Sequence, residues 1–177
     1  KKIALGIALF FLALVIVALF NDRESAVALV VGLALILFLT AIPFLVLLKM
    51  GIRDKKIFRL FLITFLIHLC SALFLYVIMY HTSIRFLGGG SDFDLYQNNA
   101  IEAAHRFRAG NFSLQGLFTE HYFAVFIGII YLFTMPHIMI GQMFTVWCAA
   151  VCALIVYALV VEIGGSKKWA FLIGLLA

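Results

Sequence analysis

Charge is scarce in this sequence, and acidic residues are the scarcest kind. Charged residues make up 12% of the 177 residues and hydrophobic residues 66%, with a mean hydropathy of +1.19. Soluble globular domains contain about 25% charged and about 45–50% apolar residues. The composition therefore excludes an ordinary soluble domain and predicts an all-α, polytopic bundle of transmembrane helices. The net charge of +5 does not indicate a nucleic-acid partner, because the lysines and arginines flank apolar runs, where membrane topology places them.

Cysteines and recognisable motifs are also sparse. Cys70, Cys148 and Cys152 all lie inside apolar runs, which excludes a secreted disulfide framework. Cys148 and Cys152 share one helix face, where a packing role explains them better than a metal site. The sequence contains no dinucleotide-binding, P-loop, CxxC or HExxH pattern, and no internal repeat. We therefore expect no cofactor.

Long apolar runs fill most of the chain, and short polar stretches separate them. A transmembrane helix needs about 20 predominantly apolar residues. The predicted spans are 3–20, 26–48, 57–80, 122–140 and 144–161, and a further, incomplete run covers 169–177. Because the sequence starts without Met and stops inside this last run, we expect it to be a fragment of a longer protein.

Basic residues determine the predicted orientation. The strongest positive cluster consists of Lys49, Arg53, Lys55, Lys56 and Arg59. The positive-inside rule places this cluster in the cytoplasm, so the loop 81–121 is predicted to be extracytoplasmic, in a bacterial inner or plasma membrane. Two arrangements then remain open. If 122–140 and 144–161 both cross, Lys167 and Lys168 lie outside; if the shorter segment is re-entrant or interfacial, they lie inside. We expect two crossings.

The loop 81–121 holds four of the eight acidic residues, namely Asp92, Asp94, Glu102 and Glu120. Before them, three consecutive glycines at 88–90 do not sustain a helix. Ser91 and Asp94 form a capping-box pattern, which predicts a helix that begins at about Asp92. Gly110 is placed to end this helix.

The predicted loop helix is amphipathic. One of its faces carries Tyr96, Ala100, Ala103, Ala104 and Phe107. Its polar and charged residues lie mostly on other faces. This pattern predicts a short helix that lies on or near the membrane surface.

The same helix carries a sequence pattern that resembles a pattern of one enzyme class. Ser91, Asp92, Tyr96 and Ala100 read Ser-Asp-x-x-x-Tyr-x-x-x-Ala, just past a membrane span, and small residues follow up to Gly110. This arrangement resembles the GT-C class glycosyltransferases, membrane enzymes that use polyprenyl-phosphate sugars. The resemblance covers residues 75–177. The chain departs from the class in lacking a proline at the start of the next helix and in having two additional spans before residue 57.

The resemblance implies roles for residues of the loop. It makes Asp92 the general base, which removes a proton from the acceptor hydroxyl during attack on the anomeric carbon. It also requires cations for the lipid-phosphate leaving group. The candidate substrate-binding residues are Asp94, Tyr96, Arg85, Arg106, Arg108, Glu120 and His121.

Local structure alone is sufficient to account for some of these residues. The capping box accounts for Asp94, and interfacial anchoring beside Tyr122 accounts for Glu120 and His121. Asp92 and Asp94 also form a D-x-D pattern that favours a divalent metal, but on a helix the two point about 200° apart. The expected assignment is therefore a base at Asp92 and no metal site.

Two functions from different classes fit the sequence. The first is sugar transfer from a polyprenyl-phosphate donor to a glycan, lipid or protein acceptor at the outer membrane face. The alternative is a non-catalytic membrane component, such as a transporter or flippase subunit or a scaffold. A transporter places ionisable groups near the bilayer midplane, where only His68 lies, and a bond to Ser71, Thr64 or a facing helix explains that histidine. The clustering of carboxylates in one outer loop therefore favours the transferase.

Overall fold

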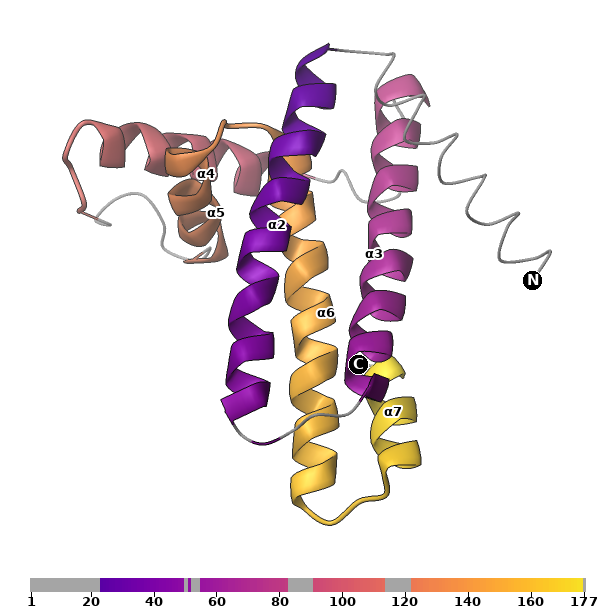
Figure 1. Ribbon diagram of the computed structural model, residues 1–177. Helices are drawn as coiled ribbons and strands as arrows, with labels where there is room; N and C mark the ends of the chain where they lie inside the picture. The colour runs from indigo at the N-terminus through magenta and orange to yellow at the C-terminus, as the bar shows by residue number, and fades with distance from the viewer. Residues whose placement is uncertain (1–22, 50, 52–54, 83–90, 114–121, 177) are drawn as a thin grey trace. The chain divides into compact units, whose positions relative to one another are not determined.

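All the regular secondary structure in the part of the chain that the structure describes is α-helical. The computed structural model describes residues 23–49, 51, 55–82, 91–113 and 122–176, and the side chains of 77–82 and 91–94 lie outside that description. Its helices are α2 (Arg23–Lys49), α3 (Lys55–Thr82), α4 (Ser91–Arg108), α5 (Tyr122–Phe133), α6 (Ile138–Glu162) and α7 (Lys167–Leu176) (Figure 1). No strand occurs in these described ranges. The predicted all-α fold is confirmed.

Three of the helices are long and apolar enough to cross a membrane. They are Arg23–Lys49, Lys55–Tyr76 within α3, and Ile138–Glu162. At about 1.5 Å per residue, each exceeds the roughly 30 Å of a bilayer's hydrocarbon core. Large apolar side chains also face outward from them; Leu37 and Phe38 are 76% and 74% exposed. The chain is therefore a membrane protein, and the predicted span 3–20 lies outside the described residues.

The segment 122–140 differs from the expectation of one continuous span. Helix α5 ends at Phe133, and α6 begins at Ile138. Pro136 disfavours helical backbone at the residue before it. His137 then caps the start of α6, because its ring Nδ1 accepts a hydrogen bond from the Met139 amide at 3.2 Å. The twelve residues of α5 extend about 18 Å, which is too short to cross the hydrocarbon core.

The described chain divides into two compact units. Of the described residues, unit 1 comprises 23–32, 73–82, 91–113 and 122–142, and unit 2 comprises 33–49, 51, 55–72 and 143–176. Helices α2, α3 and α6 each contribute residues to both units. The loop helix α4 and the short helix α5 belong to unit 1, and α7 belongs to unit 2.

Unit 2 has an apolar core formed by four helices. Leu47 of α2, Leu60 of α3, Tyr157 of α6 and Ala170 of α7 are all buried in one cluster. Gly174 allows α7 to approach closely, because a Cβ there would lie 2.9 Å from the Ala153 carbonyl oxygen. The helices therefore meet through small residues, as is common between membrane helices.

The same cluster brings particular helix ends together. Leu47 lies near the C-terminus of α2, Ile57 near the N-terminus of α3, Tyr157 toward the C-terminus of α6, and Ala170 near the N-terminus of α7. Figure 1 shows these four ends at the lower end of the drawing. Within unit 2, α6 therefore runs antiparallel to α3 and returns to the end from which α3 departs. We call this end, which carries Lys49, Lys55, Lys56, Arg59, Lys167 and Lys168, the basic end of unit 2.

Candidate functional site

The loop helix α4 forms as its sequence predicts. It begins at Ser91, within one residue of the expected start, and ends at Arg108. Gly110 follows with a φ of 76°. The Gly110 amide donates to the Phe107 carbonyl at 3.0 Å, and the Asn111 amide donates to the Arg106 carbonyl at 2.9 Å. This pair of bonds is a Schellman motif, so the predicted glycine stop is confirmed.

The predicted apolar face of α4 is buried. Ala100, Ala103 and Ala104 are at most 1% exposed, and Phe107 is 7% exposed. The covering element is α5, because Ala103 and Phe107 pack against Val125 and Leu132. The face predicted to rest on the membrane surface is therefore occupied largely by another helix of the chain.

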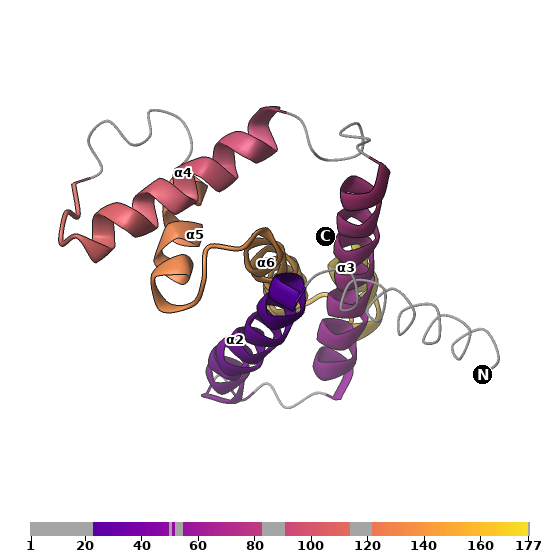
Figure 2. The ribbon, with the colours of Figure 1, turned by 90° about the horizontal axis from the view of Figure 1, so that it is seen from above.

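Helix α4 crosses α5 at a contact between small residues (Figure 2). A Cβ added at Gly128 would lie 2.6 Å from the Ala103 Cβ and 2.9 Å from the Ala100 carbonyl oxygen. Both distances are shorter than an ordinary van der Waals contact of about 3.5–4.0 Å. Only glycine at 128 permits the observed approach of the two backbones.

Tyr131 connects three parts of unit 1. Its hydroxyl donates a hydrogen bond to Gln97 Oε1 of α4 at 2.7 Å. Its carbonyl oxygen accepts a bond from Arg108 Nη2 at 2.7 Å. A Cβ at Gly141 of α6 would lie 3.1 Å from the Tyr131 hydroxyl. Tyr131 therefore joins α4 to α5 at two places, through its hydroxyl and its backbone carbonyl, and its ring hydroxyl lies against the first turn of α6.

Burial also affects the acidity of Tyr131, which is 0% exposed in a helix that is not among the three membrane-spanning candidates. Desolvation raises the pKa of its phenol above the ordinary value, and the hydrogen bond with Gln97 opposes that rise only partly. The phenol is thus a neutral hydrogen-bond donor at neutral pH. Its role in this arrangement is to position α4.

The predicted base lies in the first turn of α4. Asp92 and Asp94 are the second and fourth residues of the helix, and their side chains lie outside the described part of the chain. Arg85, Glu120 and His121 also fall outside the described residues. A carboxylate in the first turn of a helix is stabilised by the helix dipole, which favours its ionised form. The assignments of these five residues stay predictions.

Tyr96 packs against the beginning of α5. Its ring lies 6.4 Å from that of Phe123, centroid to centroid, at an interplanar angle of 75°. This edge-to-face geometry is favourable for aromatic pairs. Tyr96 therefore helps to attach the N-terminal half of α4 to α5, close to the two aspartates in sequence.

The two described arginine candidates both have protein partners. Arg106 Nε lies 2.9 Å from Glu102 Oε1, one helical turn earlier. Arg108 donates to the Tyr131 carbonyl and so satisfies an acceptor in the last turn of α5. Exposed ion pairs of this type contribute only about 0.3–0.5 kcal/mol. The ion pair of Arg106 with Glu102 therefore contributes little to stability, whereas Arg108 has a structural role.

Sequence reasoning did not identify a polar contact among the long helices of unit 1. Ser25 Oγ of α2 and the Tyr76 hydroxyl of α3 share a buried hydrogen bond at 2.6 Å. The Tyr76 ring also lies 6.4 Å from the ring of His137, which precedes α6. The only sequence signal was the presence of polar side chains at or near apolar runs. The contact joins α2, α3 and the start of α6.

Two further candidates for a functional role are a metal-binding cluster and His68, the histidine of the third predicted span. Among the described residues, no group of three or more His, Cys, Asp or Glu side chains could hold a metal ion. The Asp92 and Asp94 carboxylates are not part of that set. His68 Nδ1 lies 3.0 Å from the Thr64 carbonyl oxygen, one turn earlier in α3. This local bond gives His68 the structural role expected from the sequence.

Comparison with known proteins returned no relative: no protein-family model, curated protein or solved structure matches the chain.

Proposed function

We propose that the chain is a GT-C type glycosyltransferase, or part of one, that transfers a sugar from a polyprenyl-phosphate donor to an acceptor at the outer membrane face. The observation that carries the proposal is the anchoring of α4. This polar helix is attached to the apolar helix α5 through Gly128 and Tyr131. The attachment gives the acidic first turn a fixed support, which a positioned catalytic base requires.

The proposed reaction needs one carboxylate and one phosphate-binding group. The Asp92 carboxylate accepts the proton of the acceptor hydroxyl while the hydroxyl oxygen bonds to the anomeric carbon. The bond between that carbon and the phosphate oxygen breaks, and the lipid phosphate leaves with the electron pair. Arg106 is the described residue best suited to bind this leaving group, because its ion pair with Glu102 is exposed.

The basic end of unit 2 supports an outer location for the loop. The C-termini of α2 and α6 lie at this end with the N-termini of α3 and α7. Positive residues at span ends favour the cytoplasmic side. In this topology α3 leaves the cytoplasmic side and α6 returns to it, so the segment 83–137 starts and finishes outside. Helix α5 then does not cross the membrane, which corresponds to the re-entrant or interfacial alternative.

Two asparagine substitutions test the catalytic assignment. In membranes that contain the full-length protein, Asp92→Asn is expected to lower transfer from a polyprenyl-phosphate sugar by at least about 10²-fold, the lower range for general base catalysis. Asp94→Asn is the matched control and should lose less, because an amide oxygen still accepts hydrogen bonds from a helix N-terminus. Transfer is normalised to the amount of membrane-inserted protein.

The outcomes separate the alternatives. Near-normal transfer by Asp92→Asn contradicts the base assignment. If both variants lose transfer equally and transfer depends on added Mg²⁺ or Mn²⁺, the assignment of Asp92 as a base is wrong, and the D-x-D pair binds a metal instead. The engagement of Arg108 with Tyr131 favours the second candidate function, a non-catalytic membrane component. That candidate predicts no transfer by the unmodified protein with any polyprenyl-phosphate sugar.

A further inference from the structure

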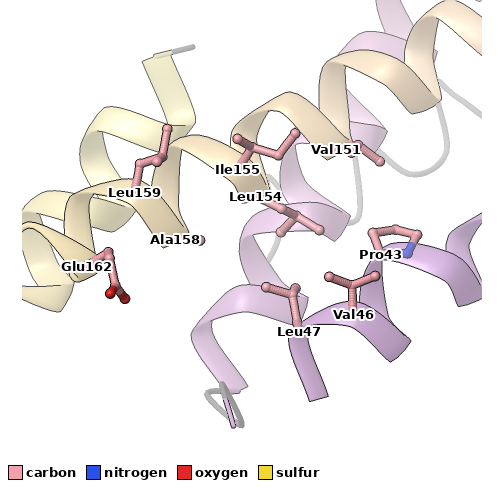
Figure 3. Close-up of a pocket in the computed structure, with 9 residues that line it drawn as sticks. All are labelled: Pro43, Val46, Leu47, Val151, Leu154, Ile155, Ala158, Leu159 and Glu162. Atoms are coloured by element: carbon pink, nitrogen blue, oxygen red, sulfur yellow. The ribbon is translucent and has the colours of Figure 1, made fainter. Parts of the chain in front are cut away.

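Unit 2 contains an apolar pocket that the proposed transferase function does not use. The pocket has a volume of about 360 Å³ and lies between the C-terminal parts of α2 and α6 (Figure 3). Its lining residues are Pro43, Val46, Leu47, Val151, Leu154, Ile155, Ala158, Leu159 and Glu162. All of them except Glu162 are apolar. A pocket of this size lies within the range of small-molecule sites, and its lining suits a hydrocarbon chain.

The position of the pocket restricts its occupant. Both helices that line it are long and apolar enough to span a membrane. Ile155 and Leu159 are 55% and 58% exposed, so the lining continues onto the outer surface of α6. In a bilayer such a surface faces lipid, so membrane lipid is the most abundant molecule that can enter.

Charge around one end of the pocket indicates which lipid it is. Leu47 lies two residues before Lys49, and Glu162 lies five residues before Lys167. The pocket therefore extends to the basic end of unit 2, where Lys168 also lies. Glu162 is the only acidic residue among the described residues of this end. The net positive charge complements a phosphate head group.

We propose that this pocket binds one hydrocarbon chain of an anionic phospholipid, whose phosphate lies near Lys49, Lys167 and Lys168. The hydrocarbon chain fills the apolar space between α2 and α6, and the lysines select the head group. The site lies in unit 2, whereas the proposed transferase site lies on α4 in unit 1. The inference therefore stands whether or not the protein transfers sugars.

The binding test uses the full chain, reconstituted in vesicles of phosphatidylglycerol and phosphatidylcholine with identical acyl chains in equal amounts. The protein is released in mild detergent, and retained lipids are counted by native mass spectrometry. We expect phosphatidylglycerol to be retained over phosphatidylcholine by at least about five-fold, the effect of roughly one lysine near an anionic surface. Equal retention of the two lipids would overturn the proposal.

A pair of alanine substitutions tests the pocket. Ala158 lines it, so Ala158→Leu fills part of its volume and is expected to reduce the retention of both lipids. Ala41 is exposed on α2 and does not line the pocket, so Ala41→Leu is the matched control and should retain lipid normally. Unchanged retention by Ala158→Leu would show that lipid binds elsewhere, or that another helix fills the pocket, and either result overturns the proposal.

Two charge variants test the head group. Lys167→Gln combined with Lys168→Gln should lower the preference for phosphatidylglycerol by about five-fold for each lysine near the phosphate. Glu162→Gln should raise phosphatidylglycerol retention, because it removes the one acidic group among the described residues of this end. Lower phosphatidylcholine retention in Glu162→Gln, with phosphatidylglycerol retention unchanged, would indicate a lipid ammonium bound to the carboxylate and would overturn the anionic assignment.

Discussion

The close contact between α4 and α5 leads to a prediction about Gly128. In Gly128→Ala, the new methyl group would lie 2.6 Å from the Ala103 Cβ and 2.9 Å from the Ala100 carbonyl oxygen. Because one of these atoms belongs to the backbone, the helices must separate by about 1 Å to restore normal contact. Overpacking of this kind typically costs about 1–3 kcal/mol. Alanine has a greater helix propensity than glycine, but this does not offset the cost. Residue 128 is in the helix α5 both when α4 is attached and when it is detached, so the gain in propensity is the same in both states.

Hydrogen exchange of the α4 amides measures the detachment directly. In detergent-solubilised protein, a loss of about 1–3 kcal/mol raises the exchange rate of residues 95–108 by roughly 5- to 150-fold, provided that exchange requires α4 to open. Exchange in α7 serves as the internal control and should not change. The double variant Gly128→Ala with Ala103→Gly removes the shorter contact and should recover part of the protection. Unchanged or slower exchange in α4 of Gly128→Ala would refute the packing argument.

Three further predictions follow from other contacts. Tyr131→Phe removes the hydroxyl that bonds to Gln97 and should destabilise unit 1 by about 0.5–1.5 kcal/mol, seen as a lower thermal midpoint. A midpoint equal to that of the unmodified protein would contradict the role of this bond. Gly110→Ala places an L-residue at a φ of 76°, where its Cβ would have no neighbour within 4 Å, so only backbone strain opposes the substitution. The free energy of unfolding should fall by about 1–2 kcal/mol, seen again as a lower thermal midpoint, and Gly110→Asn should lower it less. An impermeant thiol reagent should label a Ser113→Cys variant in intact cells and a Lys168→Cys variant only after permeabilisation; labelling of Lys168→Cys in intact cells would overturn the proposed topology.

The sequence predicted the features of the site that depend on local chemistry. The bounds of α4 followed from the Ser91 signal and from Gly110, which adopts the left-handed conformation required of a C′ residue. Helical periodicity identified the buried face that contains Ala100 and Ala103. These signals are local because capping and periodicity involve residues within a few positions of one another.

Features that depend on distant partners could not be predicted. Gln97 looked like an ordinary polar residue, and its bond to Tyr131 joins residues 34 positions apart. The bond between Ser25 and Tyr76 spans 51 positions. Hydropathy also treated 122–140 as one run, because Thr134 to His137 interrupt it only briefly. The break there depends on the backbone restriction before Pro136 and on the cap at His137.

The shortness of α5 and the position of Lys167 and Lys168 are two separate observations that support the proposed topology. Twelve helical residues extend about 18 Å, so α5 alone cannot carry the chain across a hydrocarbon core of roughly 30 Å. Independently, the core of unit 2 places the C-terminus of α6 beside the N-terminus of α3, which brings both lysines to the end that already carries Lys49. A topology with two crossings after the loop would separate these positive charges across the membrane and would require α5 to span it. In the proposed topology, with α5 on the outer side, all the described lysines of unit 2 share the cytoplasmic side.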